Sequence, residues 1–529
     1  MPKLIILGLD GATWDILMPL LNEGRLKNLK RMVENGSYGN LISTIPPITS
    51  PAWVSMATGK NPGQLGVFDL LYRENEEELT LKPVYFYMFK GSFYWDFLSN
   101  MGYRVGLIFY PFLYPPYRIN GIMVPGYGAP SEEKMYPSTL SDEIKKRFGE
   151  IKFMKGSPAG LSDEKAFKEI VSITKQHFEI GKYIIENNDL DVITFVISGT
   201  DWIQHFFWKF LDPTHALYDE KIATVYREKI FKFYEYIDEQ IGDIIGMFPD
   251  SNFIIVSDHG FGSLDQYFNL VKWLIDNGYM VFKRKISGYS KFKNSILQFM
   301  SKINRRIPIV KIIPRSISKK AWATLKIDIS EVLDLERTKA FCLGHHTSMG
   351  SIYVNKTLIS NKKDVEKIKN DIKNGLIETL KRFGVENVKF YSKEDIYHGK
   401  KAHLAPDMWF SVNDGRCAIM QQRIDHPVLF ENVPLEKRIN GSHRFEGIFL
   451  AYGPDLAAKG NMGDLSIYDI APTVLSFFGI PPPSDMDGKV IEEILPRGRV
   501  RNIKSVSARD LEKMRIKEKL RQMKQLKNV

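Results

Sequence analysis

Six acidic and imidazole side chains stand beside short apolar runs that are scattered over the whole sequence. They are Asp10, Asp201, His205, Asp258, His259 and His443. Carboxylates mixed with imidazoles suit divalent metals of intermediate hardness, Zn²⁺ first and Mn²⁺ next. In an α/β sheet the loops at the carboxyl ends of the strands share one crevice, so residues far apart in sequence meet there. The pattern predicts a two-metal hydrolase.

These motifs differ in how specific they are. The SDHG segment at Ser257–Gly260 follows the apolar run FIIV, and two adjacent ligand types at a strand end favour chemistry over a hydrogen-bonded turn. Asp201 and His205 are four residues apart and would share one helix face. Taken alone, that pair is more typical of a helix cap and an ordinary histidine. For Asp10, N-capping of the following helix is a competing interpretation.

The segment ITSPAWVSMATG carries the candidate nucleophile. Thr49 precedes Ser50 and Pro51, and Pro51 is well placed as the first residue of a short helix. A hydroxyl at a helix N-terminus meets unpaired N–H groups and the positive end of the dipole, which favour an alkoxide and phosphoryl oxygens. Capping by either hydroxyl is the alternative, and the sequence does not separate Thr49 from Ser50.

Composition bounds the class of protein. The 529 residues are 44% hydrophobic and 26% charged, which is ample for a large core and more than one domain. The two cysteines, Cys342 and Cys417, form neither a disulfide framework nor a CxxC thiolate site. The apolar run at the N-terminus is too short for a signal peptide, and no run of about eighteen apolar residues occurs. We therefore expect an intracellular, cytoplasmic protein.

The net charge of +11 is concentrated in one stretch. Residues 283–320 contain twelve Lys or Arg and no Asp or Glu, enough to account for the whole excess. One interpretation is attraction of an anionic partner, such as a phosphorylated substrate, an anionic membrane surface or a nucleic acid. The other is a solvated insertion that the basic residues keep soluble.

The order of predicted elements indicates an α/β fold. Strands are expected at Lys3–Leu9, Val105–Tyr110, Val192–Ile197, Phe253–Val256, Ser351–Asn355 and Gly447–Tyr452. Helices are expected at Leu17–Asn35, Ser162–Glu186, His215–Phe248, Lys363–Phe383 and Asp469–Phe478. We predict a sheet-containing core in two parts, 1–266 and 336–496, interrupted by a basic inserted lid at 267–335 and followed by a basic tail at 497–529.

The ordered set of motifs resembles the alkaline phosphatase superfamily, most closely its type I phosphodiesterase/nucleotide pyrophosphatase family. The matching pieces are LDG, the TSPAW…TG block, DxxxH, SDHG and a late GxH before GIFLAYGP, in this order over Lys3–Gly488. The resemblance implies an alkaline-phosphatase-like three-layer sandwich with a mostly parallel central sheet.

The resemblance also implies a divided metal site. Asp201, His205 and His443 would hold one ion. Asp10, Asp258 and His259 would hold the other, and the hydroxyl of Thr49 would bind near it. Thr49 would attack phosphorus and form a phosphothreonine-like intermediate, with two ions about 3.5–4 Å apart stabilising the attacking and leaving oxygens.

This chain departs from the family pattern near the nucleophile. An Asn that contacts the phosphate in that family is replaced by Leu70, and Lys60 is a candidate substrate contact instead. In the LGHHTSMG segment, His346 is a candidate pocket residue. A formylglycine sulfatase is disfavoured because no Cys or Ser is followed by x-Pro-x-Arg at this block. The serine nucleophile and large insertion of cofactor-independent phosphoglycerate mutases are not evident either.

Together these features predict a metal-dependent hydrolase that acts on a small phosphorylated substrate, as a phosphodiesterase or a phosphatase. A phosphotransferase or phosphomutase on the same scaffold is the first alternative. A non-catalytic binder of anionic surfaces is the second. No recognised nucleic-acid motif occurs, so a nucleic acid is not expected as a specific partner.

Overall fold

The computed structural model describes residues 1–129, 134–154, 161–283, 333–344, 347–422, 426–433 and 439–496, with Lys513 and Ile516 singly. Its centre is an eight-stranded sheet with the order β19-β2-β18-β8-β1-β7-β5-β6. The strands are β1 (Leu4–Leu9), β2 (Ser37–Ile42), β5 (Val105–Tyr110), β6 (Gly121–Pro125), β7 (Val192–Ile197), β8 (Asn252–Val256), β18 (Glu446–Tyr452) and β19 (Gly460–Ser466). Only β18 is antiparallel to its neighbours in this sheet. The expected mostly parallel sheet is confirmed.

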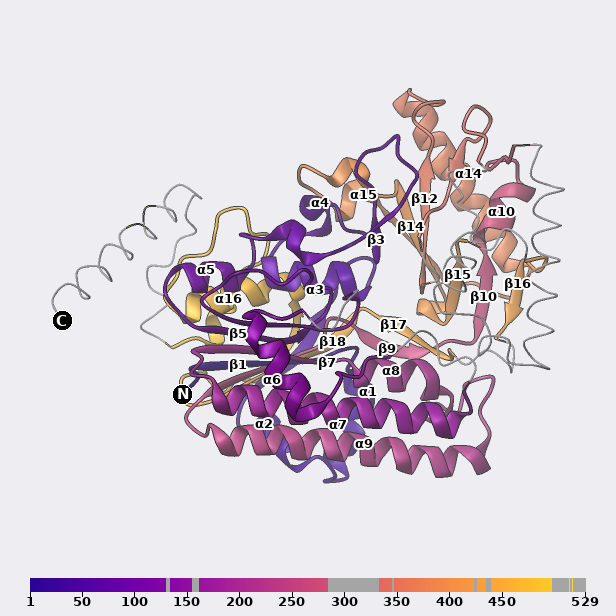
Figure 1. Cartoon of the computed structure of the whole chain (residues 1–529). Helices are drawn as coiled ribbons and strands as arrows, with labels where there is room; N and C mark the ends of the chain where they lie inside the picture. The colour runs from indigo at the N-terminus through magenta and orange to yellow at the C-terminus, as the bar shows by residue number, and fades with distance from the viewer. Residues whose placement is uncertain are drawn as a thin grey trace.

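Apolar side chains alternate between the two faces of the sheet, and each face is covered by helices. Along β1, Ile5 and Leu7 pack into one core while Leu4 and Ile6 pack into the other, as the two-residue period of a strand requires. The first core takes in α1 (Trp14–Asn22), α2 (Lys27–Glu34), α6 (Ser138–Phe148), α7 (Asp163–Asn187), α8 (Gly199–Phe207) and α9 (Glu220–Met247). The second takes in α3 (Thr49–Thr58), α5 (Tyr94–Asn100) and α16 (Ile470–Phe477). Figure 1 shows the resulting three layers, which confirm the predicted sandwich.

The helix predicted at Leu17–Asn35 is two helices in the structure. α1 ends before Gly24, which has a left-handed φ of 72°, and α2 begins at Lys27. The N–H of Gly24 donates to the carbonyl of Leu21 and that of Arg25 to the carbonyl of Leu20. These bonds close a glycine-type C-cap, which ends the helix. The apolar spacing continues across this break, and for that reason the sequence predicted a single helix.

The helix predicted at His215–Phe248 begins later than expected. α9 starts at Glu220, because the side chain of Asp219 accepts the N–H groups of Lys221 and Ile222 and so acts as its N-cap. α7 agrees closely with its prediction, and the side chain of Ser162 caps it.

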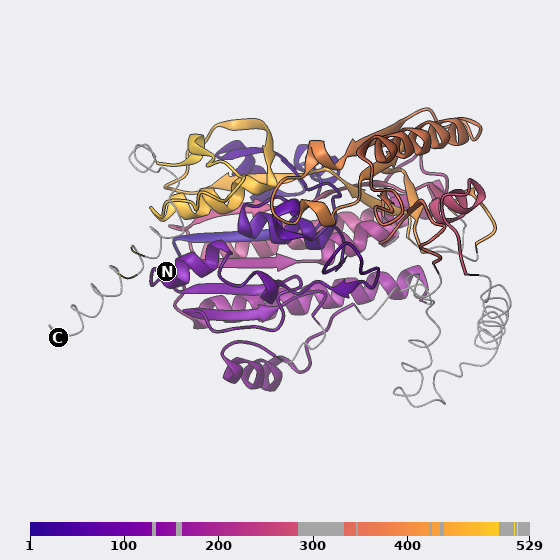
Figure 2. The ribbon, with the colours of Figure 1, turned by 90° about the horizontal axis from the view of Figure 1, so that it is seen from above.

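A second lobe lies beside the central sheet (Figures 1 and 2). One of its sheets contains β15 (Cys417–Met420), β10 (Gln266–Asn269) and β16 (Phe430–Asn432). The other contains β11 (Ala340–Phe341), β12 (Met349–Val354), β14 (Met408–Val412) and β13 (Val388–Ser392). Their apolar faces form a separate core with α10 (Leu270–Asp276) and α14 (Lys362–Lys381). The strand predicted at Ser351–Asn355 exists, but it belongs to this lobe and not to the central sheet.

A short ribbon joins the lobes. β9 (Gly260–Ser263) pairs in antiparallel fashion with β17 (Gly441–Arg444), beyond the end of β8. Most of the basic insertion at 267–335, and almost all of the tail at 497–529, lie outside the described residues, so both stay predictions. Among the described residues, no helix is long and apolar enough to cross a membrane.

Candidate active site

The six ligand candidates gather at the carboxyl ends of the central strands. Asp10 follows β1, the pair Asp258 and His259 follows β8, and α8 begins directly after β7. Asp201 lies in the first turn of α8 and His205 one turn later. His443 comes from β17, opposite Phe261 of β9. The parallel strands therefore bring together residues from four distant segments of the chain.

Asp201, His205 and His443 form the first ligand group. Oδ1 of Asp201 lies 3.4 Å from Nε2 of His205 and 3.4 Å from Nε2 of His443. The two Nε2 atoms are 3.0 Å apart. These three side chains present their ligand atoms to a common point, which is the geometry needed to hold one ion.

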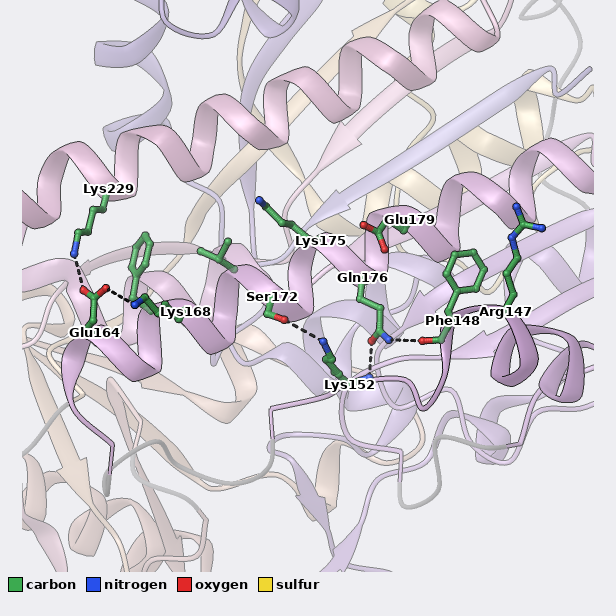
Figure 3. A pocket seen from close by; sticks show the side chains of 12 residues that line it. Arg147, Phe148, Lys152, Glu164, Lys168, Ser172, Lys175, Gln176, Glu179 and Lys229 are labelled. Carbon is green, nitrogen blue, oxygen red and sulfur yellow. Dashed lines mark hydrogen bonds and ion pairs between the residues drawn. The ribbon is translucent and has the colours of Figure 1, made fainter.

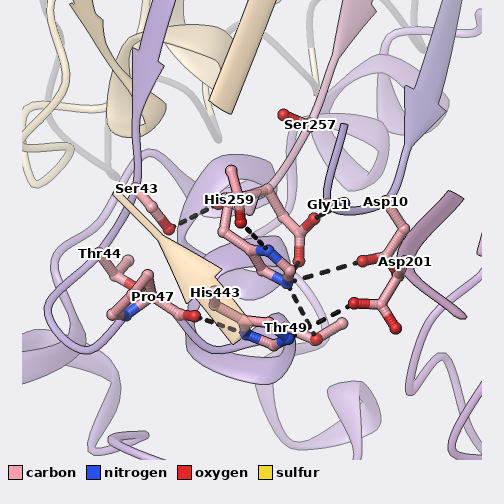
Figure 4. A network of polar contacts seen from close by, with 12 residues as sticks. Asp10, Gly11, Ser43, Thr44, Pro47, Thr49, Asp201, Ser257, His259 and His443 are labelled. Atoms are coloured by element: carbon pink, nitrogen blue, oxygen red, sulfur yellow. Dashed lines mark hydrogen bonds and ion pairs between the residues drawn. The ribbon is translucent and has the colours of Figure 1, made fainter. Parts of the chain in front are cut away.

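Asp10, Asp258 and His259 make up the second predicted ligand group, although the ligand atoms that converge on one point are those of Asp10, His259 and Asp201. Nε2 of His259 lies 3.7 Å from Oδ1 of Asp10 and 3.3 Å from Oδ2 of Asp258. Asp201 faces this group as well, because its ligand atom lies within 4.8 Å of those of Asp10 and His259. The rings of His259 and His443 stack with their centroids 3.6 Å apart. The two groups are thus contiguous, as Figure 4 shows.

Backbone carbonyls orient the three imidazoles. The Nδ1 atoms of His205, His259 and His443 lie 3.0, 3.1 and 2.9 Å from the carbonyl oxygens of Gly441, Gly260 and Pro47. A carbonyl only accepts, so each Nδ1 carries the proton and each Nε2 turns its lone pair toward the site. Burial lowers the pKa of His259 well below its ordinary value, and it also lowers the pKa of His205. Neutral imidazoles held in this way are the form that binds metals.

The carboxylates present oxygens that nothing in the described protein satisfies. Oδ1 of Asp10, Oδ1 of Asp201 and Oδ2 of Asp258 are buried and have no hydrogen-bond partner. Burial, and then the charges of Asp258 and Asp201, raise the pKa of Asp10 well above its ordinary value. Burial raises the pKa of Asp258 to about 7. Buried charges of this kind are expensive unless they are paired or coordinate a metal. The donor set therefore fits divalent cations.

Thr49 is the first residue of α3, and Ile48 is the N-cap, without a side-chain capping bond. Oγ1 of Thr49 lies 3.5 Å from Nε2 of His259, inside the ligand cluster. Ser50 is fully buried, and its hydroxyl has no partner among the described residues. Neither hydroxyl caps the helix, and Thr49 is the one that contacts the ligand cluster.

The capping alternatives for the aspartates are also resolved. Thr13, not Asp10, is the N-cap of α1. Ser198 is the N-cap of α8, so Asp201 lies inside the helix. Asp258 does accept the N–H of Gly11 through Oδ1, at 3.1 Å, as a turn aspartate would. Its other oxygen faces His259.

Sequence reasoning missed the polar side chains that hold the ligand-bearing turns together. The hydroxyl of Thr200 donates to the carbonyl of Asp10 at 2.6 Å, and the amide of Gln204 donates to that of Gly11 at 2.7 Å. The hydroxyl of Ser257 donates to the carbonyl of Ala12 at 2.8 Å. These bonds join α8 and the end of β8 to the turn after β1, and so set the spacing between the ligands. Thr200 and Ser257 directly precede ligands in the sequence, which is the only signal that singles them out.

The two ligand groups differ in exposure. The side chains of His205, His443 and Asp201 are 25%, 16% and 12% exposed. Those of Asp10, Asp258 and His259 are 2%, 0% and 0% exposed. The first group therefore faces the opening, and the second lies beneath it.

Other predicted site residues lie elsewhere. Lys60 follows the far end of α3, away from Thr49, and its ammonium bonds to Asp485 at 2.6 Å. Its predicted contact with substrate stays a prediction, and His346 lies outside the described residues. Tyr127 was not among the predicted site residues, but its ring packs edge-on to Trp202, which directly follows Asp201 of the first ligand group.

Two of the cavities in the described protein differ in their relation to the site. One of about 690 Å³ lies between the core and the second lobe, and its lining includes His443, Arg444 and Tyr391. The other, of about 790 Å³, runs along the outer side of α7 (Figure 3) and contains none of the ligand candidates. It is lined by two acidic residues, Glu164 and Glu179, of which Glu164 pairs with Lys229 and Lys168.

Comparisons with known proteins give one family match and matches to solved structures. Residues 4–445 match the family described as type I phosphodiesterase/nucleotide pyrophosphatase. No curated protein sequence matches the chain. Among solved structures, human ectonucleotide pyrophosphatase/phosphodiesterase 5 is 13% identical, with 92% of this chain and 97% of that chain covered and a TM-score of 0.49. The murine protein is 12% identical, with 93% and 100% covered and a TM-score of 0.48.

Proposed function

Since the chain belongs to the type I phosphodiesterase/nucleotide pyrophosphatase family and is a phosphoric ester hydrolase, we propose that Thr49 is its nucleophile and that its two ligand groups hold two divalent ions. The observation that carries this proposal is the position of the Thr49 hydroxyl, 3.5 Å from Nε2 of His259. It stands at the edge of a cluster whose buried carboxylate oxygens have no partner in the described protein.

The residues of the chain would act in a simple order. The N-terminal turn of α3 offers N–H groups that have no intrahelical partner, which attract the phosphoryl oxygens. Oγ1 of Thr49 attacks phosphorus in line and displaces the leaving oxygen, which takes up the proton that the hydroxyl loses. The chain then carries a phosphothreonine from a monoester, or a threonine-linked phosphodiester from a diester. Water cleaves the new P–O bond, releases phosphate or the remaining monoester, and returns a proton to the hydroxyl.

The ion sites would be held by the two ligand groups, with Asp201 facing both. Bound divalent cations would lower the pKa of the attacking hydroxyl and neutralise charge on the phosphoryl oxygens. The mixture of carboxylate and imidazole ligands favours Zn²⁺, with Mn²⁺ next. The substrate would be a small phosphoric ester that enters beside the more exposed first ligand group. The cytoplasmic location expected from the sequence is kept as part of this proposal.

The nucleophile is tested with matched variants that each remove one of two neighbouring hydroxyls. Metal-stripped protein is assayed with bis-p-nitrophenyl phosphate and p-nitrophenyl phosphate, before and after addition of Zn²⁺ or Mn²⁺. We expect Thr49→Ala to lose at least about 10³-fold in kcat/KM, as loss of a nucleophile does. Ser50→Ala, which removes a hydroxyl that is also buried and unpartnered, should stay within a few-fold of the wild type.

The mapping of the intermediate gives an independent readout. Rapid acid quench followed by mass spectrometry should find a phosphoryl group on Thr49 with the monoester and a p-nitrophenyl phosphoryl group on Thr49 with the diester, and neither group on Ser50. If Ser50→Ala is inactive while Thr49→Ala turns over normally, the assignment of the nucleophile is wrong. If both variants equal the wild type, the reaction does not use a hydroxyl of α3.

A further inference from the structure

Arg444 is a partly buried cation that the proposed chemistry does not use, and it directly follows His443 in β17. In the part of the chain that the structure describes, its guanidinium hydrogen bonds all go to backbone carbonyls and none to a carboxylate. The carboxylates of Glu446, Asp265 and Asp414 lie near enough to favour its charge, but the hydrogen bonds that fix its orientation all come from the backbone. These bonds point to a geometric task.

The carbonyls that Arg444 binds come from three different segments. Nη1 donates to His443 at 2.9 Å and to Ser442 at 3.2 Å, within its own strand. Nη2 donates to Ser263 of β9 at 2.6 Å. Nη1 also donates to Gly415 at 3.0 Å, in the turn Asn413–Gly415 that joins β14 to β15. A single planar fork thus connects the backbone of His443 to both the ribbon and the second lobe.

The surroundings are shaped to accept this guanidinium. A Cβ on Gly262 would lie 2.7 Å from Nε of Arg444, and one on Gly415 would lie 2.9 Å from Nη1. The turn that supplies the Gly415 carbonyl is a tight one, because Asn413 and Asp414 both have φ of 49°. Asn and Asp adopt this left-handed conformation more readily than other non-glycine residues, so the turn has a defined shape. Two glycines and one tight turn thus leave room for this side chain.

We propose that Arg444 is a positioning residue that couples the second lobe to the metal ligand His443. Its bonds hold the carbonyls of Ser442 and His443 in place, while Nδ1 of His443 is held by Pro47. Displacement of the turn Asn413–Gly415 would then shift the backbone that aims His443 at Asp201 and His205. The proposal rests on the proposed function in one respect, that this first ligand group holds an ion.

The test compares three variants in the full chain. Arg444→Met keeps the length and removes the fork, and Arg444→Lys keeps the charge but replaces the planar fork by one ammonium. Arg416→Met is the matched control, because Arg416 faces the same cavity but pairs with Asp265 and Asp212 and makes no bond to β17. The probe is Zn²⁺ alone, titrated against a competing chelator, with steady-state kinetics on bis-p-nitrophenyl phosphate alongside.

We expect Arg444→Met to weaken the more weakly held Zn²⁺ by about 10–100-fold, the range seen when groups that orient ligands are removed. The tightly held ion should be unaffected, Arg444→Lys should recover part of the loss, and Arg416→Met should bind within about twofold of the wild type. Excess Zn²⁺ should restore most of the kcat of Arg444→Met, because it saturates the weakened site. If folded Arg444→Met binds both ions like the wild type, the proposal is overturned.

Two further measurements test the proposal if Arg444→Met does not fold or if the protein binds no metal. If Arg444→Met does not fold, Gly415→Ala perturbs the same contact from the second lobe, and unchanged Zn²⁺ binding there overturns the proposal. In metal-free protein, hydrogen exchange at β17 should be faster in Arg444→Met than in the wild type, and equal rates would refute the coupling. That measurement does not depend on metal, so it separates this inference from a wild type that binds no ion at all.

Discussion

Replacement of Asp258 by Asn should stabilise the protein when metal is absent and weaken it when metal is present. Asp258 is fully buried, and burial raises its pKa to about 7 from its ordinary value of 3.8. The folded state therefore holds this proton more tightly than the unfolded state does. Stability from this group is complete below about pH 4 and is lost as the pH rises through about 7. At about 1.4 kcal/mol for each pKa unit, the metal-free wild type loses on the order of 4 kcal/mol by pH 8.

The geometry favours the amide. In Asp258→Asn the carbonyl oxygen can keep the hydrogen bond from the N–H of Gly11, now 3.1 Å from Oδ1. The NH₂ group would replace Oδ2, which lies 3.3 Å from Nε2 of His259. It could donate a hydrogen bond to the lone pair of that nitrogen. For 529 residues the entropy of unfolding is about 1.1 kcal/mol/K, so 4 kcal/mol corresponds to about 4 °C in melting temperature.

The assay is thermal unfolding with excess chelator at pH 4 and pH 8, and with Zn²⁺ at pH 8. We expect no difference between wild type and variant at pH 4 and a higher melting temperature for the variant at pH 8 in chelator. Zn²⁺ at 1,000 times its Kd adds about 4 kcal/mol to the wild type, which alone offers the full ligand set, and so should cancel the difference; Zn²⁺ well above that concentration should reverse the order. Asp464→Asn, at an exposed position on β19, is the control. A variant that is less stable than the wild type at pH 8 in chelator would refute the reasoning.

Two further predictions follow from the same geometry. Thr200→Val removes the hydrogen bond to the carbonyl of Asp10 at nearly constant shape and should weaken Zn²⁺ binding by about 10-fold or more. Thr200→Ser keeps the hydroxyl and should bind Zn²⁺ within a few-fold of the wild type. Equal Zn²⁺ affinities of Thr200→Val and the wild type in a chelator titration would contradict this role. Because the side chain of His205 is 25% exposed and that of Asp10 only 2%, stepwise dialysis against chelator should release one equivalent of metal well before the second, and simultaneous loss of both would show that burial does not control access.

The positions of the candidate ligands could be predicted from sequence because their signals are local. Strand-like runs before Asp10 and Asp258 are a property of short windows, and the ends of parallel strands necessarily share an edge. The hydroxyl at the start of α3 was also expected from Pro51 and its neighbours. These features depend on backbone conformation over a few residues, which the sequence specifies directly.

Other features of the site depended on contacts that no short window contains. The choice between Thr49 and Ser50 rests on the direction in which the helix enters the cluster, and a difference of one residue rotates a side chain by about 100°. The ties made by Thr200 and Gln204 are hydrogen bonds to a turn about 190 residues away in the chain. Their residue types are ordinary in a helix, so only the strand order reveals them.

By itself, the sequence determined the residue types of the candidate ligands, the class of fold and most of the helices and strands, because apolar periodicity and turn residues act locally. Tertiary structure alone decided that β12 belongs to a second lobe and that each imidazole turns Nε2 toward the carboxylates. It also decided that Arg444 reaches from His443 to Gly415. Burial and hydrogen-bond direction arise only when distant segments pack. The residues of a strand are by themselves compatible with either sheet, and a histidine side chain is by itself compatible with either tautomer.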